Sequence, residues 1–392
     1  MREQNSHTFS RILQGLLGLG CCLAASHCVI KKTTSFESYG LTTVQIQMDS
    51  ENLSQLNSTI WAKRPVNATI KVTGEEIPVV LNYAGKSTLD AFKKSYQVEI
   101  LDGRKFQGRT SFRLSSQAID PTALRSQVGF AVYQELGLPS PTAQPVSLYL
   151  DKDFQGLYQL IETVDEEFFA LEGTPITALY KAKYSNASFD IASANNLDEG
   201  LTVRYGPEGY TDVKFLIEHI NALPDPEALA KVESILDIDN FMTYTAATVL
   251  LKNWDGFVNN FFLFRRKADK KFGFAPWDLD RVYEPEPTRR PYEPDKSLWG
   301  YNRISQKLLQ VEPYRKRYLD TLQQSFQQIP LSRIFELIDQ HINSQASAFA
   351  ADRVLSARGN SIQAQGQVMK DVASVWHKQI QTELTNKLEE YP

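Results

Sequence analysis

Residues 253–280 read NWDGFVNNFFLFRRKADKKFGFAPWDLD, and this stretch carries the clearest structural signal in the sequence. Two apolar runs, at residues 261–264 and 271–274, flank a short polar segment that is typical of a turn. The pattern predicts an antiparallel hairpin inside a region that is otherwise helical. Because a hairpin returns the chain to its starting point, the acidic residues after the second run come back beside the loop that precedes the first.

Carboxylate and amide side chains lie at both ends of this hairpin. Asp255 precedes Asn260 by five residues in a predicted loop, and Asp278 and Asp280 follow the second strand. In protein kinases a loop aspartate accepts the proton of the attacking hydroxyl, and an asparagine at this interval holds a magnesium ion. If the chain stays extended, Asp278 and Asp280 share one face. Such hard oxygen ligands suit Mg²⁺ or Mn²⁺. The residues alone leave open a structural Asp-Leu-Asp turn beside a buried tryptophan.

The chain before this stretch begins with strands. Residues 41–114 alternate apolar and polar positions with breaks at glycine and asparagine, which predicts antiparallel strands. Asp120 and Pro121 then predict the start of a helix that ends at Gly137.

Two further strand-like runs, at residues 145–150 and 156–161, predict a second hairpin. Beyond residue 210 the apolar spacing becomes helical. This order of strands, one helix, strands and then helices predicts an α+β chain with two lobes that meet near residue 164.

Several motifs resemble the spore-coat CotH kinases, an atypical branch of the protein-kinase-like fold. The resemblance rests on the stretch 253–260 and on Pro276-Trp277-Asp278-Leu279-Asp280. Looser upstream matches occur in the family's order, at Lys93-Lys94-Ser95-Tyr96, Leu136-Gly137-Leu138-Pro139 and residues 156–162. The resemblance covers roughly residues 80–320. It implies a two-lobed protein-kinase-like fold with a β-rich N-lobe and a mostly helical C-lobe.

The resemblance also implies a division of the chain. The expected segments are a signal peptide or lipoprotein signal at 1–30, a β-rich extension at 31–80, a kinase-like N-lobe at 81–164 and a helical C-lobe at 165–392. The C-lobe would carry the catalytic loop and the metal-binding hairpin.

Residue roles follow from the same resemblance. It implies that Asp255 is the catalytic base, that Asn260 and Asp278 bind the metal, and that Asp280 is a supporting carboxylate. Nucleotide contacts are expected from Lys93 or Lys94 at the phosphates, from Arg125 at a phosphate or an acid, and from Glu162 or Asp165 near the ribose. The family has an arginine before the glycine of the loop that precedes these lysines, whereas this chain has Ala84 before Gly85.

The function implied by the resemblance is that of an atypical protein kinase. It would transfer the γ-phosphate of ATP, with Mg²⁺ or Mn²⁺, to Ser or Thr hydroxyls of an envelope or extracellular protein. Two alternatives stay open: an inactive CotH-like envelope protein that binds a partner or glycan, and a transferase that moves AMP on the same scaffold.

The N-terminus predicts export. Arg2 and Arg11 precede or border an apolar stretch at residues 12–25, as in a secretory signal. The stretch is shorter than the roughly 20 residues that a membrane-spanning helix needs. Lipid attachment at Cys21 or Cys22 would anchor the protein to a membrane, and its absence would leave the protein released. We therefore expect an exported protein of the cell envelope or exterior.

Composition excludes several other classes of protein. The 42 basic and 46 acidic residues give a net charge of −4, and no long basic run indicates nucleic acid as a partner. No two of the five histidines have zinc-ligand spacing, and no Gly-x-Ser-x-Gly motif indicates a serine hydrolase.

Overall fold

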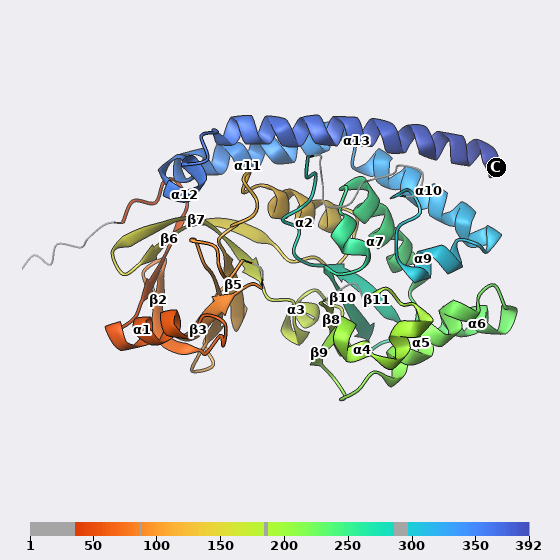
Figure 1. The fold of residues 1–392 in the computed structure, drawn as a ribbon, viewed down its shortest axis with the longest axis horizontal. Coiled ribbons are helices and arrows are strands. Elements are labelled where there is room, and N and C mark those ends of the chain that lie inside the picture. The colour runs from red at the N-terminus through yellow and green to blue at the C-terminus, as the bar shows by residue number, and fades with distance from the viewer. Residues whose placement is uncertain (1–35, 87, 184–186, 286–296, 392) are drawn as a thin grey trace, which may run out of the picture. The chain divides into compact units, whose positions relative to one another are not determined.

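A closed β-barrel forms the first half of the structure (Figure 1). The computed structural model describes residues 36–86, 88–183, 187–285 and 297–391. The barrel has the strand order β1-β2-β3-β4-β5-β7-β6, and β6 closes it by pairing in parallel with β1. Its strands are β1 (Thr42–Gln47), β2 (Val66–Val72), β3 (Glu75–Ala84), β4 (Ser95–Ile100), β5 (Ser111–Ser115), β6 (Ala143–Leu150) and β7 (Asp153–Glu162). Alternate residues of these strands fill the barrel interior, as the period of two requires.

The barrel joins segments that the sequence separates. Strand β3 runs across residue 80, so the expected N-terminal extension and the expected N-lobe share one sheet. A helix, α1 (Ser50–Ser58), also interrupts the predicted run of strands. The side chain of Asp49 caps α1 by accepting the backbone N–H of Asn52 at 2.7 Å.

Helix α2 (Arg125–Glu135) begins later than the sequence predicts. The Asp120 carboxylate does not cap a helix at residue 121. It accepts the backbone N–H groups of Thr122 at 2.9 Å and Arg125 at 3.1 Å, and so holds a turn ahead of the helix. The prediction of the N-cap is therefore wrong in position, because the left-handed backbone at Ala123 (φ +54°) ends the turn before the helix starts.

The second half is mostly helical, as expected, but contains a four-stranded sheet. The sheet order is β11-β10-β8-β9, built from β8 (Ile176–Ala182), β9 (Leu201–Tyr205), β10 (Phe261–Arg266) and β11 (Phe272–Pro276). The hairpin of β10 and β11 is confirmed, with Phe261 opposite Pro276. Strands β8 and β9 were not predicted from the sequence, since they lie where the apolar pattern is short. The barrel ends at Glu162 and β8 starts at Ile176, so the two sheets are joined through residues 163–175 and α3 (Glu166–Leu171).

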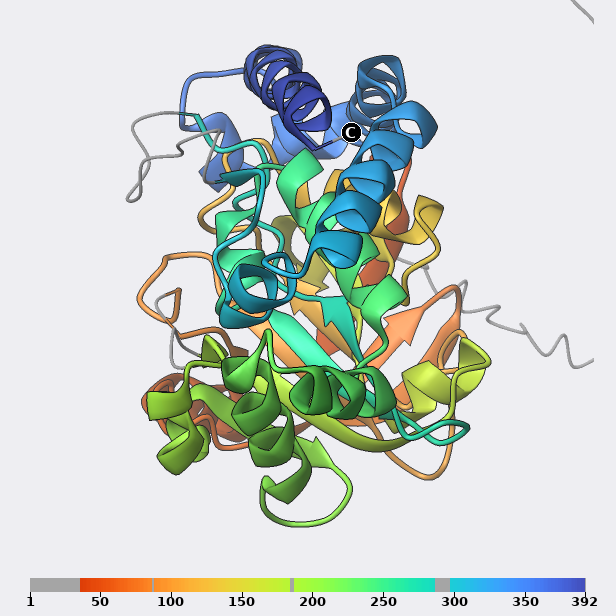
Figure 2. The same cartoon turned by 90° about the vertical axis from the view of Figure 1, so that its right-hand side faces the viewer.

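Helices cover this sheet on two sides, as Figures 1 and 2 show together. On one side lie α4 (Leu197–Gly200), α5 (Thr211–Ala222) and α6 (Pro226–Ile235), with the short turn η2 (Ile191–Asn195) nearby. On the other side lie α7 (Ile238–Leu250), α10 (Glu312–Gln328) and α13 (Ile362–Glu390). The remaining helices are α9 (Arg303–Leu308), α11 (Leu331–Ala351) and α12 (Arg353–Ser356).

The C-terminal helices return to the barrel. Helix α11 packs against β7 and α2, and the residue that caps α12, Asp352, contacts the barrel. No helix within the described ranges is both long enough and apolar enough to cross a membrane. The predicted signal, with Cys21 and Cys22, lies outside the described residues.

Candidate active site

The loop after α7 carries the expected catalytic aspartate. Asp255 lies in the short 3₁₀ turn η3 (Trp254–Phe257), and its side chain is about one-third exposed. Its backbone carbonyl accepts the N–H groups of Asn259 and Asn260, each at 2.9 Å, which curls the loop around it. The Nε atom of Arg281 lies 3.8 Å from the Asp255 carboxylate. The carboxylate is thus held at an accessible position by a neighbouring cation.

Buried hydroxyl groups fix this loop to two helices. The Tyr244 hydroxyl, from α7, donates to the carbonyl of Gly256 at 2.8 Å. The Asn253 amide donates to the Tyr133 hydroxyl of α2 at 3.4 Å. A Cβ atom at Gly256 would lie 2.6 Å from the Asn253 amide nitrogen, so only glycine fits there. The position of Asp255 therefore depends on both α7 and α2.

The hairpin brings the second acidic segment to this loop, as predicted. The Trp277 N–H donates to the Asn260 carbonyl, and the Asn260 amide donates to the Asp278 carbonyl, both at 3.2 Å. The strand ends at Pro276, and Asp278 has φ of +55°, so the expected extended alternation through Asp280 is wrong. The carboxylates of Asp278 and Asp280 still line one pocket, because the chain changes direction at Asp278.

Helix α2 packs against Leu279, the residue between Asp278 and Asp280. Leu279 is fully buried, and a Cβ atom at Gly129 of α2 would lie 2.7 Å from its Cδ1. The Arg125 guanidinium donates to the Asp280 carbonyl at 3.2 Å. Helix and acidic segment are therefore in direct contact, and the glycine allows their close approach.

The acidic residues repel one another. Burial raises the pKa of Asp280 well above its ordinary value, and the neighbouring Asp278 and Asp120 raise it further. A divalent cation would relieve this repulsion, and Asp278, Asp280 and the Asn260 amide oxygen are the hard ligands that Mg²⁺ prefers. The described residues contain no group of three or more His, Cys, Asp or Glu side chains that could hold a metal ion by themselves.

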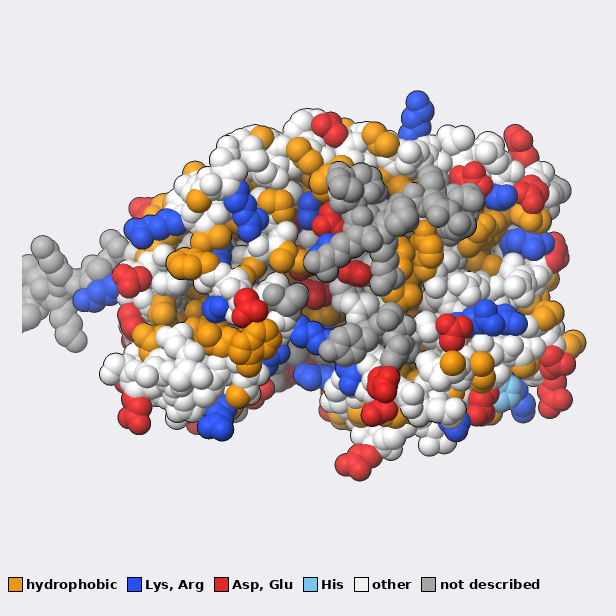
Figure 3. Space-filling view, in the orientation of Figure 1, with side chains coloured by type: hydrophobic (Ala, Val, Ile, Leu, Met, Phe, Trp, Pro, Cys, Tyr) orange, Lys and Arg blue, Asp and Glu red, His pale blue; other side chains and the backbone are white. Residues whose placement is uncertain are grey.

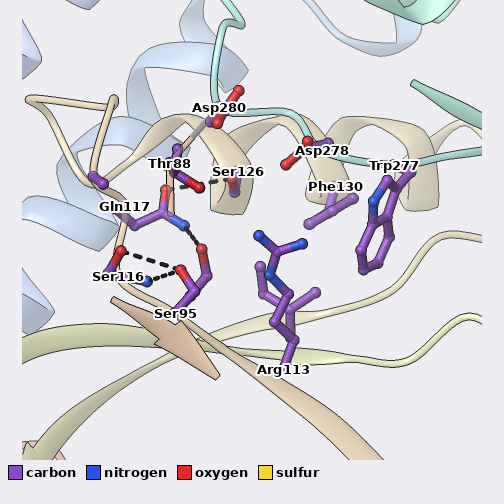
Figure 4. A pocket seen from close by; sticks show the side chains of 13 residues that line it. Thr88, Ser95, Arg113, Ser116, Gln117, Ser126, Phe130, Trp277, Asp278 and Asp280 are labelled. Atoms are coloured by element: carbon purple, nitrogen blue, oxygen red, sulfur yellow. Dashed lines mark hydrogen bonds between the residues drawn. The ribbon is translucent and has the colours of Figure 1, made fainter. Parts of the chain in front are cut away.

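Figure 4 shows the pocket that these carboxylates line. Its empty volume is about 420 Å³, part of it open to solvent. Hydroxyl and amide side chains form one wall: Ser95 and Ser116 share a hydrogen bond of 3.1 Å, and Gln117 donates to Ser115 at 2.9 Å. Thr88, from the loop after β3, contributes another hydroxyl. The wall thus offers polar groups opposite the carboxylates.

Arg113 of β5 is the basic residue of the pocket lining, and the sequence analysis missed it. Figure 4 shows its guanidinium directed toward Asp278. Its Nε is buried without a hydrogen-bond partner in the described parts of the chain, and its Cζ lies 5.9 Å from the Trp277 ring. In β5 the side chains of Phe112 and Leu114 are buried in the barrel, so the alternation places Arg113 between them on the outer face of the strand. This alternation could have predicted from the sequence that Arg113 lies outside the barrel.

Lys181 of β8 packs on Trp277, the tryptophan near which Arg113 also lies. Its Nζ lies 4.3 Å from the centre of the Trp277 ring and 5.5 Å from that of Phe262. Burial, followed by the nearby charge of Arg113, lowers the pKa of Lys181 to about 7, and Asp278 opposes the change. On the face of the molecule that Figure 3 draws, basic and acidic side chains lie close together near the middle.

The two expected phosphate-binding lysines lie elsewhere. The Lys93 ammonium is buried, pairs with Asp352 at 2.7 Å and donates to the Leu157 carbonyl. The Lys94 ammonium donates to the carbonyls of Leu89 and Ala91, inside the loop after β3. Neither side chain lines the pocket, because each one is used to hold a loop or a helix in place.

Arg125 and Glu162 are also engaged by the protein itself. Arg125 is buried, and its Nε lies 3.5 Å from Asp120, which favours the acid over the phosphate as its partner. The Glu162 carboxylate accepts from Arg109 at 2.7 Å and from the backbone N–H of Thr142 at 2.8 Å. The pocket is lined by the preceding residue, Ile161, and does not include Glu162. The structure therefore brings together Asn260, Asp278 and Asp280, with Asp255 in the adjoining loop, and leaves the expected nucleotide contacts outside.

A β-rich lobe, a mostly helical lobe and two converging acidic loops define a kinase-like α+β protein. The chain belongs to the CotH family, since the family model described as CotH kinase protein matches residues 81–375. A curated relative, the inner spore coat protein H of Bacillus subtilis, is 26% identical over 293 residues, which are 73% of this chain and 81% of the relative.

Solved structures give weaker matches. The Helicobacter pylori proinflammatory kinase CtkA is 11% identical, and the match covers 78% of this chain and 95% of that one with a TM-score of 0.28. A chain of the Shewanella oneidensis HipA–HipB toxin–antitoxin complex with operator DNA is 10% identical, and the match covers 88% of this chain and 74% of that one with a TM-score of 0.38.

Proposed function

We propose that this protein is an atypical protein kinase that transfers the γ-phosphate of ATP to Ser or Thr hydroxyls of a protein. The observation that carries the proposal is the junction of Asn260 with the Trp277–Asp278 segment through two hydrogen bonds. This junction joins the loop of Asp255 and Asn260 to Asp278 and Asp280, the two carboxylates that line the pocket, and a base, an amide and two carboxylates are the groups that phosphoryl transfer needs.

In the proposed reaction Asp255 orients the acceptor hydroxyl and takes its proton as the oxygen bonds to the γ-phosphorus. The bond from that phosphorus to the bridging oxygen breaks, and ADP leaves. Asn260 and Asp278 would hold Mg²⁺, with Asp280 in support, and the ion supplies neutralisation of phosphate charge when bound. Arg113 binds the phosphates. In this role it takes the place of the arginine that the family has where this chain has Ala84.

Because the relative in Bacillus subtilis is a spore coat protein, we also propose an outer-layer or envelope location for this protein. The expected substrate is then a protein of the same layer.

The test uses purified protein with radiolabelled ATP and Mg²⁺ or Mn²⁺, and a Ser- and Thr-rich protein acceptor. We expect Asp255→Asn to reduce transfer by about 10²–10⁴-fold, because proton acceptance is lost. Asp278→Ala should abolish metal-dependent nucleotide binding. Asp153→Asn, an exposed change in the β6–β7 turn, is the matched control and should leave transfer unchanged.

Mass spectrometry of the product identifies the transferred group. An added phosphate supports the kinase, whereas an added AMP would replace the proposal by an AMP transferase. Wild-type protein that binds no ATP at millimolar concentration would overturn both reactions and favour a non-catalytic envelope protein.

A further inference from the structure

Lys181 is a partly buried cation that does not itself line the pocket but packs on Trp277, which does, and the proposed reaction does not use it. Its ammonium group forms no ion pair within 4 Å and no hydrogen bond in the part of the chain that the structure describes; its contacts are the rings of Trp277 and Phe262. A cation removed from water without a paired anion is costly to the folded state. Its position therefore calls for an explanation beyond packing.

The charges around Lys181 add to this cost. Arg113, Arg204 and Lys63 lower the pKa of Lys181 electrostatically, and Asp278 opposes them. Arg113 likewise has a buried Nε without a partner. Two cations from different lobes thus flank Trp277, and neither has a carboxylate partner within 4 Å in the described ranges. A polyanion bound between them would neutralise both.

Pocket chemistry identifies the kind of polyanion. Asp278 and Asp280 line the same pocket as Arg113, and Asp278 also acts electrostatically on Lys181, so a free phosphate or a peptide carboxylate would be repelled on the acidic side. A polyphosphate with a divalent cation satisfies both groups at once, since the metal meets the acids and the phosphates meet the bases. An ammonium is a mobile point charge that suits phosphate oxygens.

We propose that Lys181 is a second phosphate-binding residue, which acts with Arg113 to hold the polyphosphate of a metal-bound nucleotide from the C-terminal half of the protein. This inference rests on the proposed function, because it requires a nucleotide in the same pocket. It makes the site selective for nucleotides with at least two phosphates over a nucleoside.

The test compares binding of ATP, ADP and adenosine, with Mg²⁺, by calorimetry on the full protein. Lys181→Met keeps the stem that packs on Phe262 and Trp277 and removes the charge. We expect it to weaken ATP and ADP about 10- to 100-fold, the effect of a lost charge-assisted hydrogen bond, and to leave adenosine unchanged. Lys181→Arg should retain most of the ATP affinity. Lys267→Met, in the exposed β10–β11 turn, is the control and should bind as the wild type does.

A second measurement needs no variant and so does not depend on folding of the mutant. The wild-type protein is acetylated briefly with acetic anhydride, and the extent of labelling at each lysine is read by mass spectrometry. Mg²⁺ with ATP should protect Lys181 several-fold more than adenosine does, while labelling of Lys267 stays constant.

The outcomes separate the two proposals. Wild-type protein that binds no ATP would overturn the proposed function. ATP binding that Lys181→Met leaves intact, or saturating ATP that leaves acetylation of Lys181 unchanged, would overturn this inference alone.

Discussion

The buried ion pair between Lys93 and Asp352 allows a quantitative test of whether Lys93 has a structural role or contacts the nucleotide. Asp352 is completely buried, and its carboxylate accepts four hydrogen bonds. The donors are Lys93 at 2.7 Å, Leu157 N–H at 2.9 Å, Val354 N–H at 2.9 Å and Leu355 N–H at 3.0 Å. Asp352→Asn keeps the volume of the side chain and places an N–H₂ group opposite Lys93 and the Leu157 N–H.

The expected cost follows from burial. Removing one partner of a buried ion pair leaves an uncompensated charge, which destabilises a protein by about 3–5 kcal/mol. With an unfolding entropy of about 2.1 cal/mol/K per residue and roughly 350 ordered residues, ~4 kcal/mol corresponds to a fall in Tm of about 5 °C. The double change Lys93→Met with Asp352→Asn should recover part of the loss, because no uncompensated charge is left and the asparagine oxygen can still accept the N–H groups of Val354 and Leu355.

The assay is thermal unfolding followed by circular dichroism, with nucleotide binding measured well below Tm. Lys152→Met, in the exposed β6–β7 turn, is the control and should unfold as the wild type does. We expect Lys93→Met to lower Tm and to leave the Kd for ATP unchanged, since the ammonium contacts Asp352 and not the pocket. A Tm within 1 °C of wild type, or a selective loss of ATP binding, would refute the structural role of Lys93.

Three further predictions concern the packing of α2, the pH dependence of stability and the charge of Arg113. Gly129→Ala should destabilise the protein by about 1–3 kcal/mol in urea unfolding and weaken metal-dependent ATP binding, because its Cβ would meet Leu279 at 2.7 Å; unchanged binding would contradict the role of α2. Burial lowers the pKa of His377 to about 4, whereas the pKa of a histidine in the unfolded chain is about 6.5. Between these pH values the unfolded chain binds one more proton than the folded chain. The free energy of unfolding should therefore fall on acidification, by up to ~3 kcal/mol. His377→Phe should flatten that part of the pH profile of Tm, and an unchanged profile would refute it, although His341 adds a fall in the same direction. Arg113→Lys should keep more ATP affinity than Arg113→Met, and equal losses would contradict a charge-based role for this residue.

Local patterns were sufficient for much of the fold. The β10–β11 hairpin follows from two apolar runs around a polar turn, and α7 from apolar spacing, because these contacts are close in sequence. The meeting of Asn260 with Asp278 follows from the same hairpin. The pairing of β8 with β10 and the parallel pairing of β1 with β6 could not be predicted in this way, since the paired strands lie far apart in the sequence.

The family, the β10–β11 hairpin and the acidic half of the site follow from the amino-acid sequence alone, because motif residues and turn signals act over short distances. Only the tertiary structure decided which cations face that site. A lysine is equally basic wherever it stands in a sequence, and burial against Asp352 turns Lys93 into a structural residue. Packing of β5 and β8 around Trp277 instead brings Arg113 and Lys181 to the acids. Electrostatic roles depend on distance and desolvation, which are properties of the folded chain.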